Sequence, residues 1–77
     1  MNQKEHISNI LLIIGKNVKR LRIEKNMTQQ DLAYNCGNMD KSTISRIETF
    51  TLSGLNISTL IKISLVLEVE IDKLFEK

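Results

Sequence analysis

The apolar positions in the first third of the chain follow the period of an α-helix. They return every three or four residues and form one stripe: Ile7, Ile10, Leu11, Ile14, Val18 and Leu21. This spacing predicts a helix from about Ser8 to Lys25. At roughly 100° per residue, Leu12 and Ile13 project away from the stripe, so they are more apolar surface than a monomer needs. Asn26 follows, where a residue that tolerates left-handed backbone geometry is expected.

Residues 27–48 contain two short helix patterns, and the first is expected over about 29–36. Thr28 is suited to cap it, and Asp31 at the third helical position can reach back as in a capping box. Gly37 stands where the helix should end, because glycine tolerates a positive φ. The apolar residues of this helix share one face: Leu32, Ala33 and Cys36.

The second short helix is expected over about 41–49, with Asp40 as its cap. Ile44 and Ile47 turn inward. The opposite face is wholly polar at the spacing i, i+3, i+4, i+7: Ser42, Ser45, Arg46 and Thr49. Ser and Thr are weak helix formers, but they suit hydrogen bonding to bases. Two short helices at a tight turn predict a helix-turn-helix unit over about 28–49, whose second helix can enter the DNA major groove.

The rest of the chain predicts a loop and two more helices. Residues 50–57 resemble a loop with Ser53-Gly54 as its turn. A helix over about Ser58–Leu67 follows, and a short helix over about 71–76 ends the pattern. The sequence therefore predicts an all-α fold of five helices in one domain, residues 1–77.

Composition supports this picture and excludes other classes. Seventy-seven residues make one small domain, and Cys36 is the only cysteine, so no internal disulfide supports it and Cys36 is expected in the core. The net charge is only +2, although Lys and Arg gather between residues 16 and 25. The apolar run Ile10–Ile14 is too short for a membrane span, and no small-residue cleavage site of a secretory signal follows it, so a cytoplasmic protein is expected.

Catalytic and metal-binding patterns are missing from the sequence. His6 has no second ligand at a useful spacing, and no nucleophile–base set or glycine-rich phosphate loop is present. We therefore expect no enzyme activity, no metal, no cofactor and no small-molecule ligand.

From Ile14 to Phe75, about four-fifths of its length, the chain resembles the Cro/CI-type (Xre-like) family of bacterial and phage DNA-binding domains. The matching segments are IGKNVKRLR at 14–22, MTQQDLA at 27–33, Gly37, STISRIE at 42–48 and LIKISLVLEVEIDKLF at 60–75. The resemblance implies the five-helix, lambda-repressor-like fold. In size the chain is most similar to restriction–modification controller proteins and small phage repressors, which implies a homodimer on a palindromic operator in double-stranded DNA.

The resemblance also implies roles for single residues. Gln29 matches a position that anchors the DNA backbone, and Lys41, Ser42 and Arg46 match base-reading positions. Arg46 is the strongest candidate for a base contact, because arginine can donate two hydrogen bonds to guanine. Phosphate contact is the simpler role for Lys41. Arg22 and Glu48 match a pair that ties the first helix to the end of the third. The expected DNA-binding set is Thr28, Gln29, Lys41, Ser42, Thr43, Ser45, Arg46 and Thr49.

Three features depart from the family pattern. The turn GNMD between the second and third helices is one residue longer, with Asn38 as the insertion. Phe50 stands where the family often has glycine, which indicates another path for the loop that follows. That loop is also long.

Surplus apolar residues near the end of the chain predict the homodimer interface: Leu65, Ile71, Leu74 and Phe75. Core closure is the simpler role for Leu74 and Phe75, and we expect at least one of them to serve it. Two other functions stay open. One is an antitoxin that binds its toxin through a surface including Leu12 and Ile13. The other is a protein-interaction module without DNA binding, which the polar face of residues 42–49 argues against.

Overall fold

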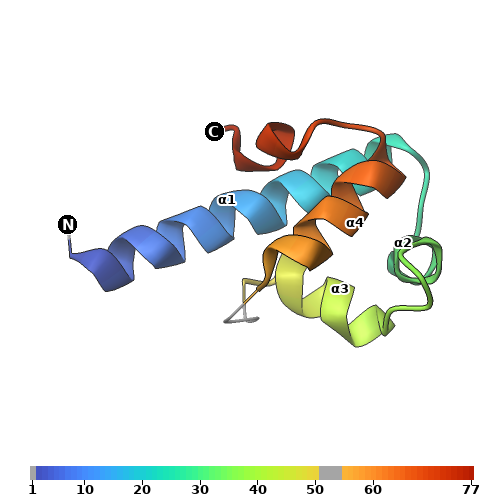
Figure 1. The fold of residues 1–77 in the computed structure, drawn as a ribbon, viewed down its shortest axis with the longest axis horizontal. Coiled ribbons are helices and arrows are strands. Elements are labelled where there is room, and N and C mark those ends of the chain that lie inside the picture. Colours follow the sequence, from blue (N-terminus) through green and yellow to red (C-terminus); the bar gives the residue numbers. More distant parts are fainter. Residues whose placement is uncertain (1, 51–54) are drawn as a thin grey trace.

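The computed structural model describes residues 2–50 and 55–77, and these form four α-helices and one 3-10 helix (Figure 1). The α-helices are α1 (Gln3–Glu24), α2 (Gln29–Asn35), α3 (Lys41–Glu48) and α4 (Ile57–Leu67), and the 3-10 helix is η1 (Ile71–Phe75). The all-α fold is confirmed. The predicted bounds of α2, α3 and α4 agree with these within one residue. The predicted turn at Ser53-Gly54 lies outside the described residues.

The predicted fifth helix is a 3-10 helix rather than an α-helix. The Lys73 N–H donates to the carbonyl of Glu70, three residues back, at 2.9 Å. Segments of about five residues commonly take this tighter form, because an α-helix closes its first hydrogen bond only over four residues.

α1 begins at Gln3, five residues before the predicted start. The side chain of Asn2 caps it by accepting a hydrogen bond from the N–H of Glu5 at 2.8 Å. The helix therefore starts at its polar cap, before the apolar stripe begins. Ile7, the first member of that stripe, is 52% exposed, and the buried residues of α1 begin only at Ile14. The N-terminal part of α1 projects beyond the other helices (Figure 1).

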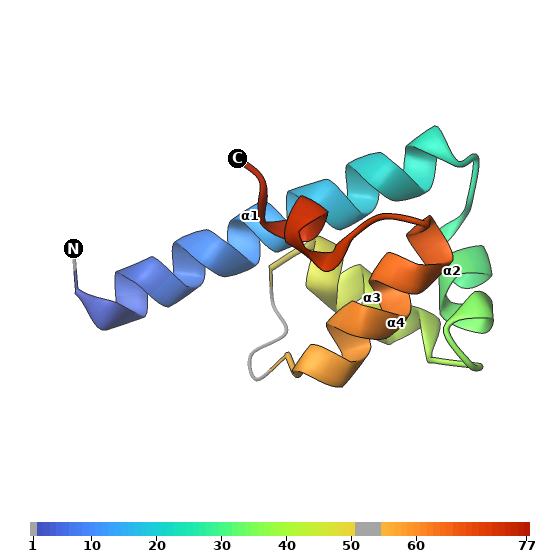
Figure 2. The ribbon, with the colours of Figure 1, turned by 45° about the horizontal axis from the view of Figure 1, so that its top comes forward.

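The core lies between α1, α2, α3, α4 and η1. α1 packs against α3 and η1, while α2 packs against α3 and α4 (Figure 2). Each helix contributes apolar side chains that are almost fully buried, among them Val18, Leu32, Ile44, Ile63 and Leu67. Cys36 is a core residue, as its position predicts, and its burial raises the pKa of the thiol.

Leu74 also belongs to this core, which corrects its prediction as an interface residue. Its side chain is fully buried because η1 folds back along α1. The side-chain amide of Asn17 in α1 holds η1 there: Nδ2 donates to the carbonyl oxygens of Leu74 at 2.8 Å and Glu76 at 2.7 Å. Leu74 thus closes the core between η1 and α1 and is not accessible to a partner.

The long turn between α2 and α3 is made by two consecutive left-handed residues. Gly37 has φ +86° and Asn38 has φ +59°. Glycine and asparagine are the residues that take this conformation at least cost, which explains how the extra residue is accommodated. Asp40 occupies the cap position of α3 as predicted, but its side chain makes no capping hydrogen bond.

Phe50 takes a left-handed conformation, with φ +65°, immediately after α3. This is costly for a bulky residue and explains why glycine suits the position. The ring of Phe50 lies against Gly15 of α1. A Cβ on Gly15 would overlap the carbonyl oxygen of Ile47 and lie 2.7 Å from the ring. Gly15 thus allows α1 and α3 to approach closely. The loop path that Phe50 was expected to alter lies outside the described residues.

Candidate nucleic-acid interface

The N-terminal end of α2 is held by a complete capping box. The Thr28 N–H donates to Oδ2 of Asp31 at 2.9 Å, and the Asp31 N–H donates to Oγ1 of Thr28 at 3.0 Å. The first of these bonds holds the pKa of Asp31 below its ordinary value. The cap determines where α2 starts and therefore where Gln29, its first residue, stands.

α3 turns its polar side outward. Ile44 and Ile47 are buried, whereas Lys41, Ser42 and Arg46 are exposed. Thr43 and Ser45 are half-buried at the edges of this polar side. α2 lies beside the N-terminal part of α3 (Figure 1). The start of α2, with Thr28 and Gln29, and the exposed residues of α3 thus belong to two helices that pack against each other.

Thr49 differs from the other members of the predicted set. It lies one residue beyond α3, at its C-cap, and its hydroxyl donates to the carbonyl oxygen of Ser45 at 2.8 Å. The hydroxyl proton is therefore used within the protein.

Arg22 and Glu48 form a bidentate ion pair between α1 and the end of α3. Nε of Arg22 donates to Oε2 of Glu48 at 2.7 Å, and Nη2 donates to Oε1 at 3.0 Å. The two side chains are only 11% and 2% exposed. The hydrogen bond to Glu48 raises the pKa of Arg22, although burial opposes this. Nη1 also donates to the carbonyl of Met27 at 2.8 Å, so Arg22 joins α1, α3 and the turn before α2.

Gln29 belongs to the same network, which the sequence did not indicate. Its side-chain Nε2 donates to Oε1 of Glu48 at 3.1 Å. The residue predicted to hold the DNA backbone is therefore oriented by the pair that fixes the end of α3. The contact depends on the angle at which α2 packs against α3. The sequence does not give that angle, so it carried no usable signal for this hydrogen bond.

The described residues contain neither a metal-binding cluster nor a membrane-spanning helix. No group of three or more His, Cys, Asp or Glu side chains is placed to hold a metal ion within residues 2–50 and 55–77. No helix in the described part of the chain is long and apolar enough to cross a membrane.

Comparison with known proteins agrees with this geometry. A family model described as helix-turn-helix matches residues 18–74, which include α2, α3 and most of the core. No curated protein matches the chain.

Two crystal structures have similar folds. The hypothetical transcription factor NHTF from Neisseria is 24% identical, with a TM-score of 0.81 over 87% of this chain and 75% of that one. The restriction–modification controller protein C.AhdI from Aeromonas hydrophila is 26% identical, with a TM-score of 0.78 over 84% of this chain and 96% of that one.

Proposed function

The chain belongs to the Cro/CI-type helix-turn-helix family, and on that premise we propose that it regulates transcription by binding specific double-stranded DNA. In this proposal α3 enters the major groove and the protein acts as a homodimer on a palindromic operator. The observation that carries it is the exposed polar side of α3, fixed in place by the buried pair of Arg22 and Glu48. A helix of eight residues so well supported presents its side chains in one orientation, as base reading requires.

The roles within the interface follow from the groups that each residue offers. We assign the reading of a guanine to Arg46, since a guanidinium carries two parallel donors. Gln29 uses one N–H of its amide on Glu48 and keeps the second for a phosphate oxygen. Lys41 at the start of α3 adds a positive charge next to the DNA backbone. Ser42, Thr43 and Ser45 supply hydroxyl groups for hydrogen bonds to bases or phosphates. Such phosphate contacts set the register, and the base contacts specify the sequence.

A homodimer is proposed because one recognition helix reads too few base pairs to find a site in a genome. A two-fold dimer doubles the site and separates the two recognition helices by about 34 Å, one turn of DNA. The proposed interface is the face of α4 and η1 that carries Leu65 and Phe75, which are 70% and 42% exposed, with the half-buried Ile71 between them in the chain. Leu74 supports this face from inside the core.

The finer role that we propose is control of a restriction–modification system. It is supported by the likeness to C.AhdI, of which 96% is covered. The genes beside this one test it: a methyltransferase and a nuclease support the role, whereas a toxin gene would favour the antitoxin alternative.

The wild-type protein is expected to prefer one DNA sequence strongly over its scrambled form. Sites selected from random duplexes and their scrambled versions are titrated at several salt concentrations. Because binding releases counterions from several phosphates, the logarithm of affinity should fall linearly with the logarithm of salt concentration for both duplexes. Equal affinity for the two duplexes at every salt concentration would rule out sequence-specific regulation.

Arg46→Ala is expected to cost about 1–3 kcal/mol on the best site and to relax the choice at one base pair. Gln29→Ala is the matched comparison, because loss of a phosphate contact should weaken all sites evenly. Affinity is measured for the selected site and its single-base variants. If Arg46→Ala weakens every duplex by the same factor, Arg46 contacts only the DNA backbone.

A further inference from the structure

The side of α1 that faces away from the core carries apolar residues at its middle and opposite charges at its two ends. At about 100° per residue, seven of its residues fall within roughly 100° of arc, opposite Ile14, Val18 and Leu21. All seven are exposed or half-buried. We call them the outer face of α1: Glu5, Asn9, Leu12, Ile13, Lys16, Arg20 and Ile23.

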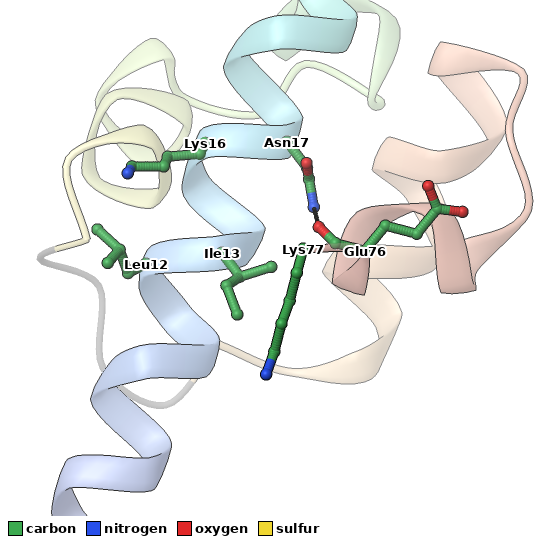
Figure 3. A pocket seen from close by; sticks show the side chains of 6 residues that line it. All are labelled: Leu12, Ile13, Lys16, Asn17, Glu76 and Lys77. Carbon is green, nitrogen blue, oxygen red and sulfur yellow. Dashed lines mark hydrogen bonds between the residues drawn. The ribbon is translucent and has the colours of Figure 1, made fainter.

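A groove of about 300 Å³ opens beside the middle of this face. Leu12, Ile13 and Lys16 line it from α1, and Glu76 and Lys77 line it from the chain after η1 (Figure 3). The hydrogen bond from Asn17 to the carbonyl of Glu76 holds the two walls together at 2.7 Å. The groove is at the small end of ligand pockets, roughly 300–1,000 Å³, and is lined mainly by aliphatic carbon, so one or two aliphatic side chains fit it.

We propose that the outer face of α1 binds the same face of a second copy of this chain, with the two helices antiparallel. A two-fold axis between Leu12 and Ile13 places Leu12 of each copy opposite Ile13 of the other, at the groove. The same axis places Glu5 of each copy opposite Arg20 of the other. Neighbouring antiparallel helices also oppose their dipoles favourably.

Charge complementarity selects a second copy over other occupants. The N-terminal half of the outer face carries one charge, on Glu5, and the C-terminal half carries two of opposite sign, on Lys16 and Arg20. Glu5 and Lys16 form no ion pair with any residue in the described ranges. Arg20 pairs with Glu24 at 3.0 Å, but both side chains are about half exposed, so that pair contributes little and can exchange. An antiparallel copy satisfies both ends at once.

The N-terminal part of α1, which extends beyond the other helices, is available for this contact (Figure 1). No residue between Gln3 and Ile13 is buried, and this part of the helix carries two apolar residues of the outer face, Leu12 and Ile13. An isolated helix of this length is marginal in water, so a partner along this part adds stability that the rest of the fold does not supply. Because the contact is centred on α1, whereas Leu65 lies on α4, a protomer with both surfaces can join dimers into larger assemblies.

The test measures association by sedimentation equilibrium in protein that carries Leu65→Glu, which disables the face of α4 and η1. This protein should still dimerise. Adding Ile13→Glu should raise the dissociation constant at least about tenfold, because it places a charge in the apolar centre of the contact. Ile7→Glu is the matched control, since Ile7 is an exposed isoleucine on the other side of the same helix and should leave the dissociation constant unchanged. Circular dichroism melting checks that both variants fold.

A charge exchange tests the register. Glu5→Arg should weaken association of the Leu65→Glu protein, and Glu5→Arg with Arg20→Glu should restore it. The proposal is overturned if the Leu65→Glu protein is monomeric at hundreds of micromolar, if Ile13→Glu and Ile7→Glu behave alike, or if the exchange fails to restore association. Titration of operator DNA with the Ile13→Glu protein, in which Leu65 is intact, tests the proposed function independently. The affinity of this variant for a single operator should be unchanged, even though its association through α1 is weakened.

Discussion

Arg22→Ala is expected to lower the free energy of unfolding by about 3–5 kcal/mol, because it leaves the carboxylate of Glu48 buried without its partner. Glu48 is only 2% exposed as a side chain and its two oxygens accept from Nε and Nη2 of Arg22. At about 0.05–0.15 kcal/mol per residue, the whole domain is stabilised by only about 4–12 kcal/mol. The variant should therefore lose a large part of its stability, which urea denaturation measures.

Arg20→Ala is the control for this prediction. Arg20 also pairs with a glutamate, but the pair is exposed and lies within one helix, so its loss should cost only about 0.3–0.5 kcal/mol. Arg22→Ala should weaken DNA binding as well, measured at a temperature where the variant is folded, because Gln29 loses the fixed position of Glu48. An unchanged melting temperature in Arg22→Ala would mean that the pair does not form in solution.

Leu74→Ala is expected to lower the free energy of unfolding by about 2–5 kcal/mol, since it removes a fully buried side chain and leaves a cavity beneath η1. Leu65→Ala is the matched control, because Leu65 is a leucine that is 70% exposed, and its truncation should change the stability of the protomer by no more than about 0.5 kcal/mol. Thermal melting at low protein concentration separates folding from association. The core assignment fails if Leu74→Ala melts like the wild type and changes only the oligomeric state.

Local patterns were sufficient for most of the fold. The period of the apolar residues located α2, α3 and α4 because a helix must bury one face, and that face repeats every three to four residues. Thr28 and Asp31 predicted the start of α2 because their capping bonds join residues only three apart. Features whose partners are close in sequence can be read without the fold.

Predictions from apolar pattern alone failed where neighbours distant in sequence decide burial. Ile7 and Leu74 are both apolar members of helical stripes, yet Ile7 is exposed and Leu74 is fully buried. The difference is whether another element covers each position. η1 folds back over the middle of α1, where the amide of Asn17 holds it. Asn17 and Leu74 are 57 residues apart in the chain, and the local sequence of neither segment indicates that contact.

The candidate site divides in the same way. The sequence by itself determined which residues form the outward side of α3, since Ser42, Ser45 and Arg46 must share a face once the helix forms. Only the tertiary structure decided that Gln29 hydrogen-bonds Glu48 and that Phe50 lies on Gly15. The physical reason is that helix periodicity depends on the chain's own geometry, whereas these contacts depend on the packing of α1, α2 and α3, which is set by all the side chains between them.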